Sequence, residues 1–264
     1  MITKIKAFFK RDFIISASYK ISFVLDIIVV FFQLLFWYYI SLFLTKNIPL
    51  EGLNYSYFEF LIIGIAFHSF LAFFLTNLSS QIRESQVTGT LQSVLSTPIS
   101  PLTFFIGTSA FGFLKTALKL FFIILFGVIL FNLNLSNINF LSLIVIFFIG
   151  IISFFSIGLI ISCFALVFKQ DISGWTDFFL RIFNIIYYPI ILFPVFIRPL
   201  LYLLPTTHYL KGIRLAIFEN ASISSLGTNI LVLSVFAVIL LPLSLWLFNY
   251  SLKVVKKKGT LVEF

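Results

Sequence analysis

The sequence has few charged residues, and acidic residues are especially scarce. Of its 264 residues 10% are charged, with 9 Asp and Glu against 18 Lys and Arg, whereas 61% are hydrophobic. This composition lies far outside the range of soluble globular domains and is typical of an integral membrane protein. The net charge of +9 is explained by anionic lipid headgroups beside the apolar segments, so no nucleic-acid partner is expected.

Cysteine and histidine are also nearly absent. The single cysteine, Cys163, lies in an apolar stretch, which excludes a disulfide or a cysteine metal site within one chain. The two histidines, His68 and His208, have no carboxylate pair at ligand spacing, so no metal site is expected. No Gly-x-x-x-x-Gly-Lys-Ser/Thr phosphate loop occurs, and ATP-driven work would therefore require another subunit.

Long apolar segments are what the sequence has in abundance. A helix needs roughly 20 apolar residues to cross a hydrocarbon core about 30 Å thick, and six segments meet this requirement. We therefore predict an all-α membrane protein with a single transmembrane domain over residues 1–264. Its six predicted spans are residues 21–44, 58–80, 102–131, 138–168, 175–197 and 229–250.

The distribution of Lys and Arg predicts the orientation of these spans. Most basic residues lie in residues 1–20, in the second and fourth connections and in the C-terminal tail, and few lie in the opposite connections. By the positive-inside rule both termini are cytoplasmic, and a multi-pass protein of the plasma (inner) membrane is expected. Residues 1–20 also form an amphipathic pattern, which predicts a helix in the cytoplasmic interface, with an apolar face of Ile2, Ile5, Phe9 and Phe13.

A polar stretch over residues 82–101 separates the second and third spans. Val87, Leu91, Val94 and Leu95 follow a helical spacing and predict one apolar stripe on a short helix over 83–97, which can dock a partner. Thr97-Pro98 ends this predicted helix, because the residue before a proline is disfavoured in the α region.

The stretch 198–227, before the last span, is apolar but interrupted by prolines too often to make a full crossing. We expect a re-entrant or interfacial helical element on the outer side of the membrane, with its backbone covered by protein.

Charges inside the predicted spans are candidates for function, because an ionisable group in hydrocarbon is costly. Lys115 and Lys119 share one face of the third span, and two interpretations stay open: they line a passage and attract anionic headgroups or cargo, or they anchor the cytoplasmic end of the helix. Arg181 follows Asp177 by one turn and either pairs with it or contacts substrate. Asp26 and Glu59 lie near span ends, where contact with water is the simpler interpretation.

Two groups of short motifs, in this order, resemble the membrane subunit of ABC-2 type exporters. The first is Glu84 with Gly89-Thr90-Leu91 and then Leu95-Ser96-Thr97-Pro98, with Gln92 where the family often has an acidic residue. The second comprises Tyr188-Pro189, Pro194, the run Leu204 to His208, and Gly212-Ile213-Arg214. The resemblance covers nearly the whole chain.

The resemblance implies an ABC-2 (type V exporter-like) fold, in which permease subunits form a homodimer or heterodimer on two copies of an ABC ATP-binding subunit. It implies that ATP and Mg bind in that partner, and that this chain exports a drug-, lipid- or glycan-like substrate. The resemblance assigns coupling to the partner to Arg83, Glu84, Gly89, Thr90, Leu91, Leu95, Thr97 and Pro98, and the outer element to Pro205, His208 and Arg214. An ion-coupled secondary transporter and a non-transporting membrane scaffold are the alternatives.

Overall fold

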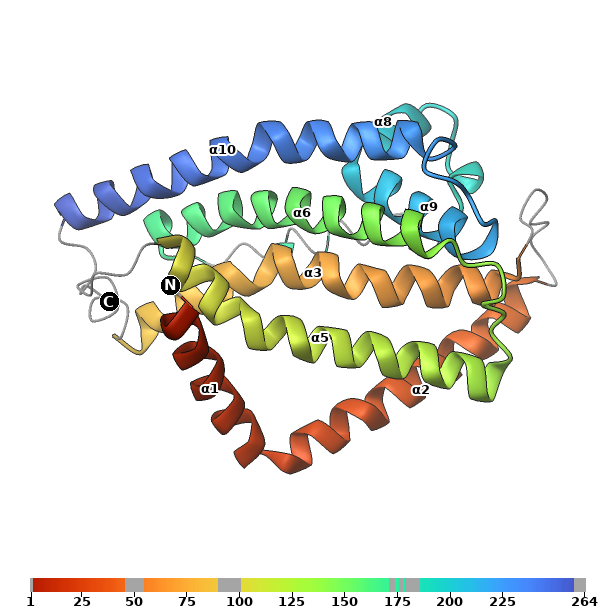
Figure 1. Cartoon of the computed structure of the whole chain (residues 1–264), viewed down its shortest axis with the longest axis horizontal. Coiled ribbons are helices and arrows are strands. Elements are labelled where there is room, and N and C mark those ends of the chain that lie inside the picture. Colours follow the sequence, from red (N-terminus) through yellow and green to blue (C-terminus); the bar gives the residue numbers. More distant parts are fainter. Residues whose placement is uncertain are drawn as a thin grey trace.

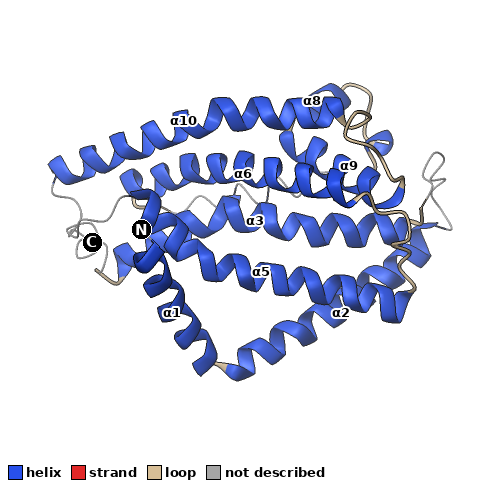
Figure 2. Cartoon of the chain, viewed as in Figure 1, coloured by secondary structure: helices blue, strands red, loops and turns tan. Residues whose placement is uncertain are grey.

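The structure is a computed structural model that describes residues 2–45, 55–89, 101–170, 174–175, 178 and 186–258, and within these ranges its regular elements are all helical (Figures 1 and 2). Five helices of the described part are long and apolar enough to cross a membrane. They overlap five of the six predicted spans: α2 (Lys20–Thr45), α3 (Tyr57–Val87), α5 (Pro101–Phe131), α6 (Phe140–Phe168) and α10 (Gly227–Lys258).

Helix α3 is the central element of the bundle. It lies between α5 and α6 (Figure 1) and contacts both. A capping box fixes its start, because the Ser56 hydroxyl accepts from the Glu59 amide and the Glu59 carboxylate accepts from the Ser56 amide. Glu59 therefore serves as a helix cap at the edge of the bundle.

Helix α6 packs between α3 and α10 (Figure 1). The Asn139 side chain caps its start by accepting from the Ser142 amide at 3.1 Å. The helix lies so close to α3 that a Cβ at Gly158 would clash with the backbone carbonyl of Phe74. Small residues at such positions let two helix backbones approach closely in a membrane.

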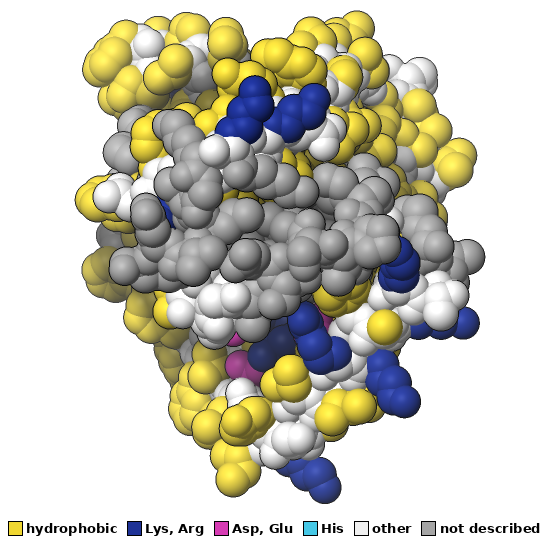
Figure 3. Space-filling model, turned by 90° about the vertical axis from the view of Figure 1, so that its left-hand side faces the viewer, with side chains coloured by type: hydrophobic (Ala, Val, Ile, Leu, Met, Phe, Trp, Pro, Cys, Tyr) yellow, Lys and Arg dark blue, Asp and Glu magenta, His cyan; other side chains and the backbone are white. Residues whose placement is uncertain are grey.

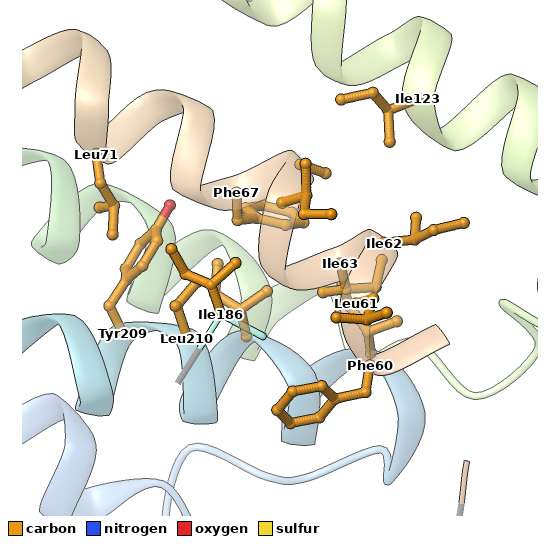
Figure 4. Close-up of a cluster of buried hydrophobic side chains, with 14 of the residues drawn as sticks. Phe60, Leu61, Ile62, Ile63, Phe67, Leu71, Ile123, Ile186, Tyr209 and Leu210 are labelled. Carbon is orange, nitrogen blue, oxygen red and sulfur yellow. The ribbon is translucent and has the colours of Figure 1, made fainter. Parts of the chain in front are cut away.

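The predicted outer element contains two short helices, α8 (Arg198–Leu203) and α9 (Pro205–Phe218). Pro199 and Pro205 lie in their first turns, where proline is tolerated because its missing N–H would have no intrahelical partner. Helix α9 contacts α6, α10 and α3, and its buried side chains join a large apolar cluster (Figure 4). Protein thus covers this element, whereas its depth in a membrane stays a prediction.

Helices α1 (Ile2–Ser18) and α2 form a V on the opposite side of the bundle, with the bend at Tyr19 (Figure 1). Helix α1 packs on α5, with the rings of Phe9 and Phe13 against Phe111 at centroid distances of 5.8 and 6.2 Å. The apolar face predicted for residues 1–20 is therefore partly used to contact α5.

The structure differs from the prediction for the fifth span, 175–197. Residues 186–197 are turns and a short 3-10 helix, η1 (Ile190–Leu192). Pro189 and Pro194 interrupt regular helix there because proline lacks an N–H and clashes with the preceding turn. Most of residues 175–185 lie outside the described part. Since α6 ends at one end of the bundle and α8 lies at the other (Figure 1), a sixth crossing between them stays a prediction.

Candidate functional site

The first group of sequence-predicted site residues lies at the end of α3. This helix continues through residues 83–87, so they extend the second span instead of beginning a separate helix. Gly89 follows with a φ of 68°, a left-handed conformation that suits glycine after a helix end. The predicted single helix over 83–97 is therefore wrong, because the helix ends at Val87 and is followed by Thr88 and Gly89 in a turn. The other positions assigned to coupling lie outside the described residues: Thr90, Leu91, Leu95, Thr97 and Pro98.

This end of α3 is attached to the end of α6. The buried Gln86 side chain donates to the carbonyls of Ala165 and Leu166 at 3.3 and 3.4 Å. Glu84, by contrast, is exposed, and Val87 is 62% exposed. The segment thus combines a buried contact to α6 with an exposed surface.

Basic side chains gather at the same end of the molecule. Figure 3 views this end and shows Lys and Arg side chains on either side of the undescribed region. The described exposed cations of α1 and of the end of α10 are Lys4, Lys6, Lys10, Arg11, Lys253 and Lys257. By the positive-inside rule this is the end expected in the cytoplasm.

The second group, Lys115 and Lys119, lies along α5. The Lys115 ammonium forms an ion pair of 2.7 Å with the carboxylate of Asp26 on α2, and each side chain is about half exposed, at 51% and 49%. This pairing was not anticipated from the sequence, because it depends on how α2 packs against α5. Arg181 and its proposed partner Asp177 lie outside the described residues.

Both lysines line cavities on the α2–α5 side. One cavity of about 730 Å³ lies between α1, α2 and α5, and a second of about 280 Å³ adjoins it and shares Asp26 and Lys115. A third of about 230 Å³ shares Thr116 and Lys119 with the second and is lined by polar side chains. Its polar lining comes from α2, α3 and α5: Gln33, His68, Ser69, Thr76, Thr116 and Lys119.

The third group, Pro205, His208 and Arg214, belongs to α9 and is buried. His208 Nε2 donates to the Tyr202 carbonyl at 2.8 Å, and Nδ1 lies 3.0 Å from the Asn229 side-chain oxygen of α10. These contacts join α8, α9 and α10, so His208 has a positioning role in the fold.

Arg214 is the most deeply placed charge of the described chain, at 2% exposure. Its guanidinium donates to the carbonyls of Phe60 and Ile186 at 3.2 and 3.1 Å, and its Cζ lies 3.5 Å from the centre of the Phe60 ring. Burial lowers the pKa of Arg214 to about 9, so the group is still charged at neutral pH. Gly64 makes room for it, since a Cβ there would clash with the guanidinium.

The described residues contain no group of three or more His, Cys, Asp or Glu side chains able to hold a metal ion. What the described part does contain is a bundle of apolar helices with buried polar contacts, cationic cavities and a basic end. These features define a multi-pass membrane protein.

A family model described as ABC-2 family transporter protein matches residues 23–259. Because the match covers most of the chain, the protein belongs to this family, as the sequence motifs predicted. Proteins of this kind are transmembrane subunits that normally work with an ATP-binding subunit. A search of curated proteins finds no match for the chain.

Proposed function

We propose that the protein is the permease subunit of an ATP-driven ABC exporter, with both termini in the cytoplasm. Two copies of a separate ATP-binding subunit would supply the energy, and two permease subunits would form the transport unit. The cargo class expected from the sequence is drug-, lipid- or glycan-like. ATP and Mg would bind in the partner, and this chain would have no ATPase activity of its own.

The observation that carries this proposal is the end of α3. Gln86 fixes it to α6, while Glu84, Val87 and Thr88 face outward. A force applied at this end would reach α3, which contacts α5, α6 and α9. Closure of an ATP-binding pair below the membrane could then shift the helices and change access between the two sides.

Co-purification with the ATP-binding subunit tests the proposal. Glu84→Lys reverses an exposed charge at the end of α3, and Glu219→Lys makes the same change at an exposed position after α9. We expect Glu84→Lys to reduce recovery of the ATP-binding subunit and transport-linked ATP hydrolysis, with Glu219→Lys close to wild type. Equal recovery with both variants would contradict the docking role of α3.

The two alternative functions predict other results. Substrate movement by the isolated chain along an ion gradient would favour a secondary transporter. Stable association with the ATP-binding subunit but no ATP-dependent movement of any cargo would favour a scaffold.

A further inference from the structure

The three cavities on the α2–α5 side follow one another along the two helices. The first and second share Phe23, Asp26, Lys115 and Leu118, and the second and third share Thr116 and Lys119. Together they form a track, which we call the α2–α5 track, that begins at the bend between α1 and α2 and ends beside His68 and Tyr187.

The charge of this track is mainly positive. The acidic and basic residues among its described lining are Lys20, Asp26, Lys115 and Lys119. Asp26 is 2.7 Å from Lys115 and offsets part of this charge. A lysine beside hydrocarbon favours an anion nearby, because neither lipid tails nor aliphatic side chains can solvate an ammonium group.

Most of the rest of the first cavity is apolar, although Ser16, Tyr19 and Ser22 also line it. Its wall is formed by side chains of α1, α2 and α5: Phe13, Phe23, Val24, Phe111, Leu114 and Leu118. Phe13 and Phe23 are partly exposed, at 52% and 43%, so this wall is accessible from the side of the bundle. A volume of about 730 Å³ falls in the range of small-molecule sites, roughly 300 to 1,000 Å³.

We propose that the α2–α5 track binds an amphiphile from the bilayer, with its anionic headgroup at Lys115 and Lys119 and its apolar part against the wall of the first cavity. An apolar wall ending in two ammonium groups is complementary to such a molecule and not to a neutral or cationic one. The assignment of this amphiphile as cargo rests on the proposed function, whereas the binding itself does not.

The test is photolabelling of the full chain in lipid nanodiscs. The probes are phosphatidylglycerol and phosphatidylcholine, each with a photoreactive group near the headgroup, and the labelled peptides are mapped. In the wild type, phosphatidylglycerol should label α2 and α5 peptides and phosphatidylcholine should label them much less. Each lysine contributes roughly fivefold to anionic-lipid binding, so Lys115→Gln with Lys119→Gln should reduce the phosphatidylglycerol label by more than tenfold.

Three further variants separate the site from general charge effects. Lys253→Gln with Lys257→Gln removes the same charge from exposed positions of α10 and should leave the α2–α5 label unchanged. Lys115→Arg with Lys119→Arg should retain the label, which would show that the label depends on positive charge at these two positions. Asp26→Asn should increase the label several-fold, because it frees Lys115 for the headgroup.

An unchanged label in the Lys115→Gln and Lys119→Gln variant, or equal labelling by both lipids in the wild type, would overturn the site. Cargo is tested with the assembled complex: ATP should move fluorescent phosphatidylglycerol to the other leaflet in the wild type and not in the glutamine variant. Lysine-dependent labelling without ATP-dependent movement would overturn the cargo assignment. Failure of the chain to bind an ATP-binding subunit would contradict the proposed function and leave the labelling result to decide the site alone.

Discussion

The most apolar stretches of helices α3 and α2 have nearly the same mean hydropathy, but 72% of that stretch is buried in α3 and only 17% in α2. Apolarity alone therefore does not determine which helix packs against protein. Small and polar residues mark the difference: α6 presents Gly150 and Gly158 to its neighbours, and Ser153 donates to the Leu233 carbonyl of α10 at 2.8 Å. Helix α2 contains no glycine or alanine at all.

The two sides also hold their charges differently. On the α3–α6–α9 side, Arg214 is enclosed and donates to two carbonyls. On the α1–α2–α5 side, Asp26 and Lys115 form a half-exposed pair beside cavities. We call the α3–α6–α9 side the tight side and the α1–α2–α5 side the open side. This division suits a protein in which one part is rigid and another part binds a ligand or moves.

The contact between α3 and α6 should give the largest effect on stability. In Gly158→Ala the new Cβ would clash with the Phe74 carbonyl, so the two helices must separate. We expect a loss of about 3 kcal/mol in the free energy of unfolding, measured by thermal denaturation in detergent. Gly227→Ala is the matched control, because a Cβ there meets nothing within 4 Å. Equal melting temperatures of Gly158→Ala and Gly227→Ala would show that α3 and α6 can separate at this contact without loss of stability.

Arg214→Lys should have the next largest effect. Lysine retains the charge but is a point donor and cannot reproduce the planar guanidinium that reaches both carbonyls and stacks on Phe60. We expect a cost of about 2 kcal/mol, again from thermal denaturation. Arg198 also donates to two carbonyls but is only half-buried, so Arg198→Lys should cost less. A larger loss of stability in Arg198→Lys than in Arg214→Lys would contradict the view that burial makes the contacts of Arg214 more stabilising.

Much of this architecture could be predicted from the sequence, because long apolar runs and basic flanks determine where helices cross and which ends lie together. The ABC-2 motifs also predicted the family. The limits are physical. The continuation of α3 through Val87 could not be inferred from a polar stretch that is equally compatible with a separate helix, and the end of the fifth span was misjudged because apolarity outweighed Pro189 and Pro194.

For the site residues, too, the sequence predicts which residues matter but not which residues they contact. The burial of Arg214 against Phe60 and Ile186, and the pairing of Lys115 with Asp26, join residues far apart in the chain. No local spacing encodes such contacts, whereas Lys115 and Lys119 themselves are marked by the cost of a charge in hydrocarbon, and Arg214 is marked by the family resemblance.

On the open side, Phe111→Ala should loosen α1 with little effect on the rest of the bundle. Phe111 contacts the rings of Phe9 and Phe13, and each aromatic pair contributes about 1 kcal/mol. Loss of both pairs should therefore accelerate amide hydrogen exchange in α1 by up to roughly 30-fold. Phe121→Ala is the control, because Phe121 lies on the same helix at 55% exposure. Unchanged exchange in α1 would mean that other contacts hold it.

The smallest effect is expected for the Asp26–Lys115 pair. Both side chains are about half exposed, so water or a headgroup can replace either partner, and such pairs contribute roughly 0.2 to 1 kcal/mol. A double-mutant cycle of Asp26→Asn and Lys115→Gln, measured by thermal denaturation, should give a coupling energy in this range, well below the cost of Arg214→Lys. A coupling above about 2 kcal/mol would place this pair among enclosed contacts, and the α1–α2–α5 side would then be a second rigid core instead of an open, ligand-accessible one.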